Sequence, residues 1–246
     1  MAKHQHFKQM MELGERRLKK KYFSEAIRAF QEAANKLATN DQESAEALYK
    51  LGSTCRIVGK LHEAEQSLVW AKAHVTAIGI DEQLDFKEQV NKDKAMSTLL
   101  MLILRDLGVT RTEIGNFLLA KQNLEQSYNI SVTEGQAEES AYTYGCIGWL
   151  KFQETGDIIE SMLFLSEANK SLMARDGYET HKRDNLIKII QVLDKKPLNY
   201  TFLALKLSAI TKSRHKFFEV LTIAIFSKRI HKKIKSNIKL KLQAPT

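Results

Sequence analysis

The chain has 246 residues, of which 43% are apolar and only two are proline, and its net charge is +9. This composition supplies enough apolar side chains for a core and excludes a disordered chain. Because glycine and proline are both scarce, long helices are favoured over an all-β fold. No segment alternates regularly between strand and helix patterns, which disfavours a parallel α/β sheet.

The N-terminal residues contain no continuous apolar stretch, and no run of 18 apolar residues occurs in the chain. We therefore expect neither a secretory signal nor a transmembrane helix. Cys55 and Cys146 lie within apolar helical patterns and form neither a CxxC motif nor a metal-ligand spacing. The expectation is a cytoplasmic protein with two buried, reduced thiols.

Four segments of thirteen residues share one pattern, and they begin at Lys21, Gly59, Gly115 and Gly156. Their third residue is apolar, the sixth is small, the tenth is large and apolar, and the last is small. In chain order these columns are Phe23, Leu61, Phe117 and Ile158; Ala26, Ala64, Ala120 and Ser161; Phe30, Leu68, Leu124 and Leu165; and Ala33, Ala71, Ser127 and Ala168. Steps of three and four residues place these side chains on one helix face, and the leading glycine suits a tight turn before the helix.

Another apolar helical pattern precedes each of these segments. The four preceding patterns cover residues 7–20, 44–58, 99–114 and 142–155. The first three contain a Leu-Gly pair, and the fourth has Gly148-Trp149 in its place. These pairs are Leu13-Gly14, Leu51-Gly52 and Leu107-Gly108. Each pattern and the segment after it therefore predict a helix–turn–helix hairpin.

The hairpins resemble the tetratricopeptide repeat (TPR) family in their Leu-Gly pairs, turn glycines and small sixth residues. The resemblance covers about residues 5 to 175. It implies an all-α fold, a right-handed TPR-like superhelical solenoid of four helix-turn-helix repeats with a helical C-terminal extension. The repeats begin 38, 56 and 41 residues apart. Periods near 40 are similar to the longer-helix TPR variety of kinesin light chains and bacterial regulators. The 56-residue interval holds an insertion at residues 78–96, which we expect to extend the neighbouring helices.

Residues 179–196 predict a helix that caps the last repeat with an apolar inner face and a polar outer face. Its apolar residues are Leu186, Ile189, Ile190 and Leu193. The domain organisation we expect is therefore a repeat domain with its capping helix at residues 5–194 and a basic helical extension at residues 195–246.

The resemblance also implies a concave groove, lined by the first helix of each pair, that holds a peptide or a helix of a partner protein. The residues expected to line it are mixed in charge, and solvated helix surface is the alternative interpretation. They are Lys8, Met11, Glu12, Glu15, Glu46, Tyr49, Lys50, Arg105 and Asp106. The carboxylate clamp of lysine, asparagine and arginine known in TPR proteins is disfavoured, because other residue types stand at its positions. These are Met11, Glu15, Lys50, Leu102 and Asp106.

No catalytic or metal-binding motif occurs: the sequence lacks HExxH, GxGxxG, a P-loop and GxSxG. The acidic residues Glu43, Glu46, Glu138 and Glu139 are interpreted as solvated charges on helices. Trp70 and Trp149 fall at core-like positions of the repeat, so we expect both to pack inside. The prediction is a protein that is not an enzyme and needs no cofactor, metal or small-molecule substrate.

The C-terminal region has a different character from the rest of the chain. From Lys195 onward thirteen lysines and arginines stand against one acid, Glu219, which is +12 and leaves −3 for the first 194 residues. Apolar residues recur every four positions at Phe226, Ile230, Ile234, Ile238 and Leu242, a pattern typical of an amphipathic helix. Its cations include Lys228, Arg229, Lys232, Lys233 and Lys235.

A basic amphipathic helix has three possible ligands: an anionic membrane surface, nucleic-acid phosphates, or an acidic protein surface, including that of this chain. Residues 198–226 are expected either to complete the solenoid as buried helices or to bind elsewhere. The function we expect is a scaffold or adaptor that binds a partner's peptide or helix in the groove. The alternatives are binding to membrane or nucleic acid through the tail, and regulation by a bound peptide.

Overall fold

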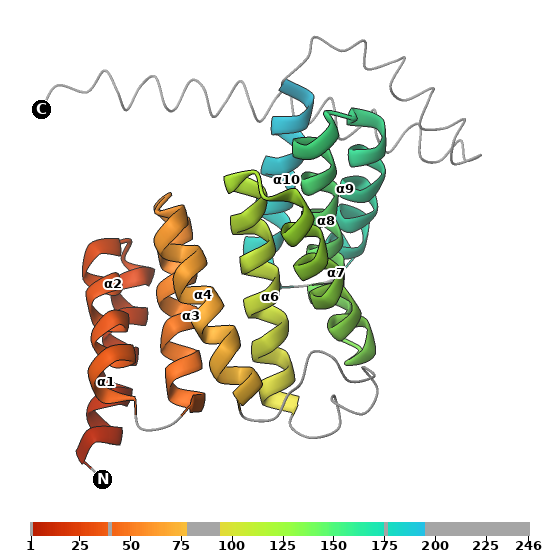
Figure 1. The fold of residues 1–246 in the computed structure, drawn as a ribbon. Helices are drawn as coiled ribbons and strands as arrows, with labels where there is room; N and C mark the ends of the chain where they lie inside the picture. The colour runs from red at the N-terminus through yellow and green to blue at the C-terminus, as the bar shows by residue number, and fades with distance from the viewer. Residues whose placement is uncertain (1, 39–40, 78–93, 175–176, 195–246) are drawn as a thin grey trace, which may run out of the picture. The chain divides into compact units, whose positions relative to one another are not determined.

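The computed structural model describes residues 2–38, 41–77, 94–174 and 177–194, and these residues form helices joined by short turns, with no β-strand among them (Figure 1). The prediction of an all-α fold is confirmed for this part of the chain. The helices are α1 (Ala2–Lys19), α2 (Phe23–Glu32), which continues as a π-helical turn at Ala33–Leu37, α3 (Asp41–Ile57), α4 (Leu61–Ala77), α6 (Lys94–Ile114), α7 (Phe117–Thr133), α8 (Ala137–Thr155), α9 (Ile158–Met173) and α10 (Glu179–Asp194).

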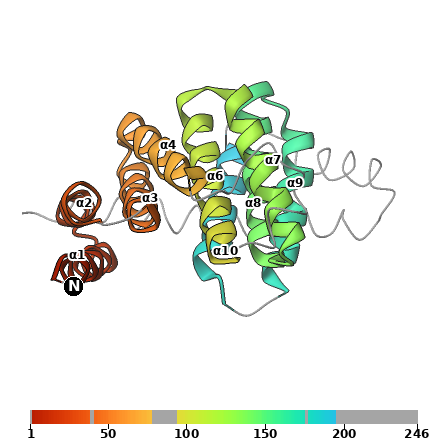
Figure 2. The same cartoon turned by 60° about the horizontal axis from the view of Figure 1, so that its bottom comes forward.

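The chain forms two compact units, residues 1–143 and 144–246, and the division falls within α8. In the first unit α1 packs on α2, α3 on α4, and α6 on α7. These hairpins follow one another through contacts of α2 with α3 and of α4 with α6. Figure 2 shows that α1 and α3, the first helices of two successive hairpins, lie on one side, and α2 and α4 on the other. The expected boundary at residue 195 coincides with the end of the described residues and stays a prediction.

The turn inside each hairpin uses a left-handed residue at the first position of the repeated segment. The φ angles are 63° at Lys21, 79° at Gly59, 93° at Gly115 and 67° at Gly156. In the first three turns the next amide donates to a carbonyl five residues back, as in a Schellman motif; for Lys60 and Cys55 the distance is 2.9 Å. The first repeat has the same turn although it lacks the glycine, so Lys21 adopts a conformation that is unfavourable for an L-residue.

The glycine of each first helix lies against a large side chain of the second helix. A Cβ built on any of these glycines would come within 2.8 Å of a side-chain atom opposite, so only glycine allows this approach. The pairs are Gly14 with Phe30, Gly52 with Leu68, Gly108 with Leu124, and Gly148 with Phe164. In the first three hairpins the large residue is the tenth of its segment, as expected from the repeat.

The fourth hairpin differs by one position. One more residue separates Gly148 from Gly156 than separates Gly108 from Gly115. Phe164 therefore lies nearest to Gly148, and the tenth residue of the segment, Leu165, lies beside it, 3.2 Å from the built Cβ. The repeat is thus preserved in its contacts while its register shifts by one residue.

The small residues of the repeat are buried between helices. The four residues at the sixth position of the repeated segment are fully buried. The four residues at its last position are at most 1% exposed. Ser127 replaces alanine at that last position, and its hydroxyl donates to the carbonyl of Met101 over 2.9 Å. This hydrogen bond between α7 and α6 compensates for burial of the hydroxyl.

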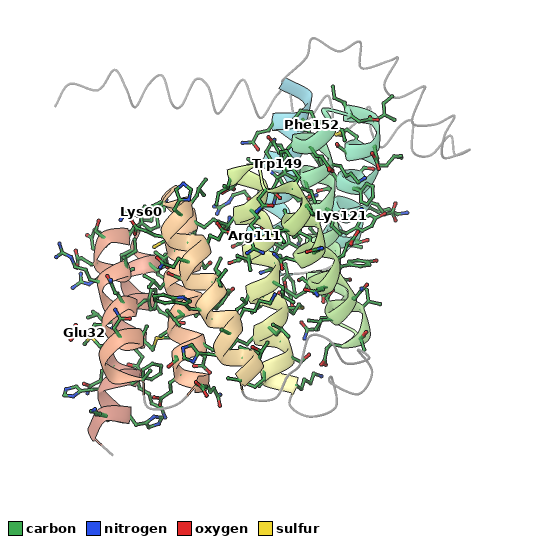
Figure 3. The ribbon with its side chains drawn as sticks, viewed as in Figure 1. Glu32, Lys60, Arg111, Lys121, Trp149 and Phe152 are labelled. Carbon is green, nitrogen blue, oxygen red and sulfur yellow. The ribbon has the colours of Figure 1, made fainter. Side chains whose placement is uncertain are left out.

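The apolar core of the first unit runs along the hairpins. Its largest cluster joins α3, α4 and α6 through side chains such as Leu48, Val75, Met101 and Leu104. Arg111 of α6, labelled in Figure 3, also forms an ion pair with Glu65 of α4 at 2.8 Å. Hydrophobic burial and this ion pair together hold α4 against α6.

In the second unit α8, α9 and α10 share a core that includes Phe152, Met162, Leu165 and Ile189. Asp157 begins α9 as its N-cap, since its carboxylate accepts hydrogen bonds from the amides of Ile159 and Glu160. Of the apolar residues expected on the capping helix, Leu186 and Ile189 pack on this core; the side chains of Ile190 and Leu193 lie outside the described residues.

The two tryptophans differ in their surroundings. Trp149 packs against the core of the second unit, with its ring 5.7 Å from that of Phe152 (Figure 3). Trp70 is 52% exposed, so the expectation that it packs inside is wrong. It lies between exposed Val69 and buried Ala71 on α4 and lines a cavity formed with α2 and α3.

Two other expectations concern cysteines and membrane spans. Cys55 and Cys146 are both buried and unpaired with each other, as predicted. No helix within the described ranges is long and apolar enough to cross a membrane. Of the insertion expected at residues 78–96, residues 94–96 begin α6, whereas residues 78–93 and the segment from residue 195 onward lie outside the described residues.

Candidate functional site

A cavity of about 560 Å³ lies in the first unit, and its walls come from α1, α3 and α6, the first helices of three hairpins. We call it the α1–α3–α6 cavity. Its lining residues are His4, Phe7, Lys8, Met11, Glu12, Glu15, Gln42, Glu43, Glu46, Tyr49, Lys50, Leu99 and Leu102. A volume of this size suits a small ligand or a few side chains of a protein segment.

Helix periodicity explains why these residues meet. The lining residues of α1 begin at His4 and end at Glu15, and they follow one another at alternating steps of three and one. Steps of one and three also connect the lining residues of α3, from Gln42 to Lys50. Such steps keep side chains on one face of a helix, so α1 and α3 each present a single stripe to the cavity.

The cavity has an apolar floor. Phe7 is buried, and Met11, Tyr49, Leu99 and Leu102 are partly buried against the core clusters of the first unit. These four side chains keep part of their apolar surface open to the cavity. Covering that surface with an apolar ligand group would be favourable by about 25 cal/mol per Å².

Charged side chains surround this floor. Lys50 forms an ion pair with Glu15 at 2.9 Å, and the His4 ring nitrogen Nδ1 contacts the Glu43 carboxylate. Glu46 accepts a hydrogen bond from Gln42 at 3.3 Å. Lys8 and Glu12 stand one turn apart on α1, and both are exposed. The lining thus contains carboxylates and cations together.

Seven of the nine residues expected from the sequence to line a partner-binding groove lie in this cavity. They are Lys8, Met11, Glu12, Glu15, Glu46, Tyr49 and Lys50. The use of these residues to bind a partner stays a prediction. Arg105 and Asp106 do not line the cavity, because they are 5% and 4% exposed and pair with other buried groups.

Arg105 is the centre of a buried charge network in the first unit. Its guanidinium contacts the carboxylate of Glu139, lies 3.8 Å from that of Asp106, and stacks 4.9 Å from the ring centre of Tyr142. Arg56 of α3 approaches Asp106 at 3.8 Å. These interactions join α3, α6 and α8 through charges of opposite sign.

The pKa values of two groups reflect this network. Burial raises the pKa of Tyr49 above its usual range, and the negative charge of Asp106 raises it further. Burial acts to lower the pKa of Arg105, but Asp106 and Glu139 outweigh it and raise the pKa overall. Tyr49 is therefore a neutral phenol that lines the cavity on one side and meets the network on the other.

The interpretation of all four acids as solvated charges is wrong for two of them. Glu43 is buried at 6% exposure beside His4, and the side chain of Glu139, 18% exposed, pairs with Arg105. In sequence, both stand at helix positions that look exposed because they lie near a helix start. Residues of another helix, His4 of α1 and Arg105 of α6, cover these two carboxylates. The local sequence around each glutamate does not show that contact.

Sequence reasoning missed several residues of the lining. They are His4, Phe7, Gln42, Glu43 and Leu99, and Leu102 was considered only as a clamp position. Extending the α1 stripe back by one turn from Lys8 and Met11 would have found His4 and Phe7. Leu99 gave no such signal, because apolar residues fill every side of α6 near it.

A second cavity of about 350 Å³ lies among α2, α3 and α4 and includes Trp70, Cys55 and Glu63 in its lining. The Cys55 thiol lies 4.0 Å from the Glu63 carboxylate, and burial, followed by this charge, raises the pKa of the thiol. A thiol with a raised pKa is a poor nucleophile. This cavity therefore offers no reactive group.

Among residues 2–38, 41–77, 94–174 and 177–194, no three side chains of histidine, cysteine, aspartate or glutamate are grouped so that they could hold a metal ion. The basic residues Lys228, Arg229, Lys232, Lys233 and Lys235 lie outside the described residues, so their expected role stays a prediction.

The chain resembles solved structures in its fold, but no protein-family model matches it and no curated protein matches it by sequence. Among solved structures, the chain is similar to BtubC (BKLC) from P. vanneervenii, with a TM-score of 0.59 and 13% identity. The similarity covers 93% of this chain and 80% of BtubC. At this identity the likeness concerns the fold alone.

Proposed function

We propose that the protein is a non-enzymatic scaffold or adaptor whose α1–α3–α6 cavity holds a peptide or helix of a partner protein. The fold we propose with it is a right-handed TPR-like solenoid of four repeats followed by a helical C-terminal extension. Three repeated contacts support that fold: the left-handed turn residue, the glycine under a large side chain, and the buried small residues.

The observation that carries the functional proposal is the composition of the cavity walls. Each wall is the first helix of a hairpin, and the lining combines open apolar side chains with charges of both signs. Apolar anchors surrounded by directional polar groups are typical of surfaces that recognise protein segments.

The test uses the whole chain to select ligands from a displayed library of random twelve-residue peptides. Recovered peptides are then measured by fluorescence anisotropy against variants that fill the cavity from exposed positions, Lys8→Trp and Glu12→Trp. We expect both variants to weaken binding by at least about tenfold, since a bulky indole occupies the ligand's space. Glu32→Trp, on the exposed outer side of α2 (Figure 3), is the matched control and should bind normally.

Two results would contradict this proposal. One is that no peptide is recovered above background. The other is that recovered peptides bind the cavity-filling variants as tightly as the unaltered chain. Circular dichroism and melting temperature of each variant establish that any loss of binding arises in a folded protein.

A second function is favoured by the sequence after residue 226, which has seven lysines and arginines and no acid. We propose it as an alternative: binding of an anionic membrane surface or nucleic acid through this tail. Removal of residues 227–246 should then abolish retention on anionic vesicles or on nucleic acid, and moderate salt should weaken retention by the full chain. Retention that survives the removal would exclude the tail as its cause.

A further inference from the structure

The lining of the α1–α3–α6 cavity has an excess of negative charge. It contains four carboxylates, from Glu12, Glu15, Glu43 and Glu46, and two lysines, Lys8 and Lys50. With His4 neutral the lining therefore has a net charge of −2. A concave surface of one sign concentrates ligands of the opposite sign.

The pairing inside the lining decides which acids are open to a ligand. Glu15 is neutralised by Lys50 at 2.9 Å, and Glu43 is buried against His4. Glu46 accepts only from the uncharged amide of Gln42, and Glu12 has no ion pair among the described residues. Among the described lining residues, Lys8 is the one lysine without an ion pair. The two negative charges of Glu12 and Glu46 therefore outnumber its positive charge by one.

The groups behind the cavity wall do not cancel this excess. Arg105 and Arg56 lie nearby, but their charges face Asp106 and Glu139 within the buried network. Tyr49, which lines the cavity and interacts with Asp106 and Arg105 of that network, is an uncharged phenol and adds no charge to the lining. The lining therefore keeps its excess of negative charge toward a ligand.

We propose that the occupant of this cavity is a basic amphipathic segment of a partner protein. Its apolar side chains cover Met11, Leu99 and Leu102, and a lysine or arginine beside them pairs with Glu12 and Glu46. An acidic or uncharged apolar segment would bury those carboxylates without compensation, which costs binding free energy. This inference rests on the function proposed above and adds the charge and polarity of the partner.

The probe is a synthetic fourteen-residue helical peptide with leucine on one face and lysine on the other. A first twin has glutamate in place of lysine, and a second twin has serine in place of leucine. Affinities for the full chain are measured by fluorescence anisotropy at low and at physiological salt. We expect the lysine peptide to bind at least about tenfold more tightly than either twin.

Charge reversal in the protein makes the test specific. In the double variant Glu12→Lys with Glu46→Lys, the lysine peptide should lose at least about tenfold in affinity and its glutamate twin should gain. The control Glu32→Lys with Glu154→Lys changes the net charge equally at exposed positions outside the cavity and should leave both affinities unchanged. Because one peptide gains affinity, the expected result cannot arise from unfolding of the variant.

Several results would overturn the inference. Equal affinity for the lysine peptide and its glutamate twin would do so, as would equal effects of the two double variants. A dimer in sedimentation that dissociates on Glu12→Lys with Glu46→Lys would assign the cavity to a second copy of the chain. Tighter peptide binding after Lys228, Arg229, Lys232 and Lys233 are changed to glutamine would assign it to the chain's own basic segment.

The library selection separates failure of this inference from failure of the proposed function. Peptides that depend on the cavity but are acidic or uncharged would refute the basic partner and leave the scaffold function in place. Peptides that bind regardless of Lys8→Trp and Glu12→Trp would refute both.

Discussion

Leu124 of α7 lies directly over Gly108 of α6, so closely that a Cβ on Gly108 would stand 2.6 Å from the Leu124 Cγ. The backbone of α7 is also close, since the Ala120 carbonyl oxygen would be 3.2 Å from the same Cβ. This contact explains why a glycine is kept in the middle of a helix, where it is normally unfavourable. The same relationship joins Gly52 to Leu68 in the preceding hairpin.

Gly108→Ala should destabilise the protein by about 1 to 3 kcal/mol, because the added methyl group overpacks the contact with Leu124. In a Leu124→Ala background the same substitution should cost less, since the space opposite is then empty. Urea denaturation of the two single variants and the double variant measures this coupling. Independent, additive effects would mean that the two side chains do not meet.

Ala64→Leu should also destabilise, by about 1 to 3 kcal/mol, because Ala64 is fully buried where α4 approaches α3. Ala73→Leu on the same helix is the control, since Ala73 is exposed and its replacement should change stability by less than about 0.5 kcal/mol. Equal melting temperatures for the two variants would argue against close helix packing at the sixth position of the repeat.

Lys21→Gly should stabilise the protein by about 0.5 to 1 kcal/mol. Its φ of 63° strains a lysine, and glycine relieves this strain at some cost in unfolded-state entropy. Gly59→Ala is the reverse change, from glycine to an L-residue at a φ of 79°. No atom lies within 4 Å of a Cβ built there, so the strain comes from the backbone alone and should destabilise by a similar amount. Thermal unfolding of both variants gives the comparison, and a loss of stability in Lys21→Gly would show that lysine is favourable there.

Arg105→Leu should cost about 3 to 5 kcal/mol, because it leaves the buried carboxylates of Asp106 and Glu139 without their main partner. Lys121→Ala is the control: it removes an exposed ion pair with Glu125 at 3.9 Å (Figure 3), which should cost less than about 0.5 kcal/mol. Chemical denaturation distinguishes the two. A mild effect of Arg105→Leu would mean that its charge is solvated rather than part of a buried network.

Stability above pH 10 should depend on Tyr49. Its folded-state pKa is raised above the ordinary value of 10.0, so the native state retains a proton that the unfolded chain loses. Stability from this residue is complete below pH 10 and falls by about 1.4 kcal/mol per pH unit above it. Relative to the unaltered chain, Tyr49→Phe should therefore gain stability as the pH rises from 10 to 11.

Tyr22→Phe is the control for this titration, because Tyr22 is 51% exposed and its hydroxyl is open to solvent. Denaturant midpoints at several alkaline pH values measure both variants against the unaltered chain. Parallel pH profiles for Tyr49→Phe and Tyr22→Phe would show that the Tyr49 phenol ionises as readily as an exposed one.

Local patterns were enough to predict the hairpins and several cavity residues. Lys8, Met11, Glu12, Glu46, Tyr49 and Lys50 recur at helix spacing, and the structure gathers them on two facing stripes. Such spacing is a property of each helix alone, so it is legible without a partner helix. The spacing of eight residues between Gly148 and Gly156, against seven in the other hairpins, also signals the register shift, but only the structure shows that Phe164 takes the place opposite Gly148.

The fates of Arg105, Asp106 and Trp70 depended on contacts between distant residues. Arg105 follows the same face of α6 as Leu102, yet Glu139 and Tyr142 from α8 enclose it. Trp70 has the neighbours of a core residue in sequence but faces outward on α4. Burial of a side chain depends on which helix lies beside it, and that helix is more than thirty residues away for Arg105.

The order of residues by itself determined the helices, their turns and the small side chains between them, because these follow from backbone preference and side-chain size within a few turns of helix. The tertiary structure alone decided which charges stay open and which are buried. Glu12 and Glu46 face the cavity while Glu43 and Glu139 are enclosed. The physical reason is that solvation of a charge depends on every group packed around it, and those groups come from separate helices.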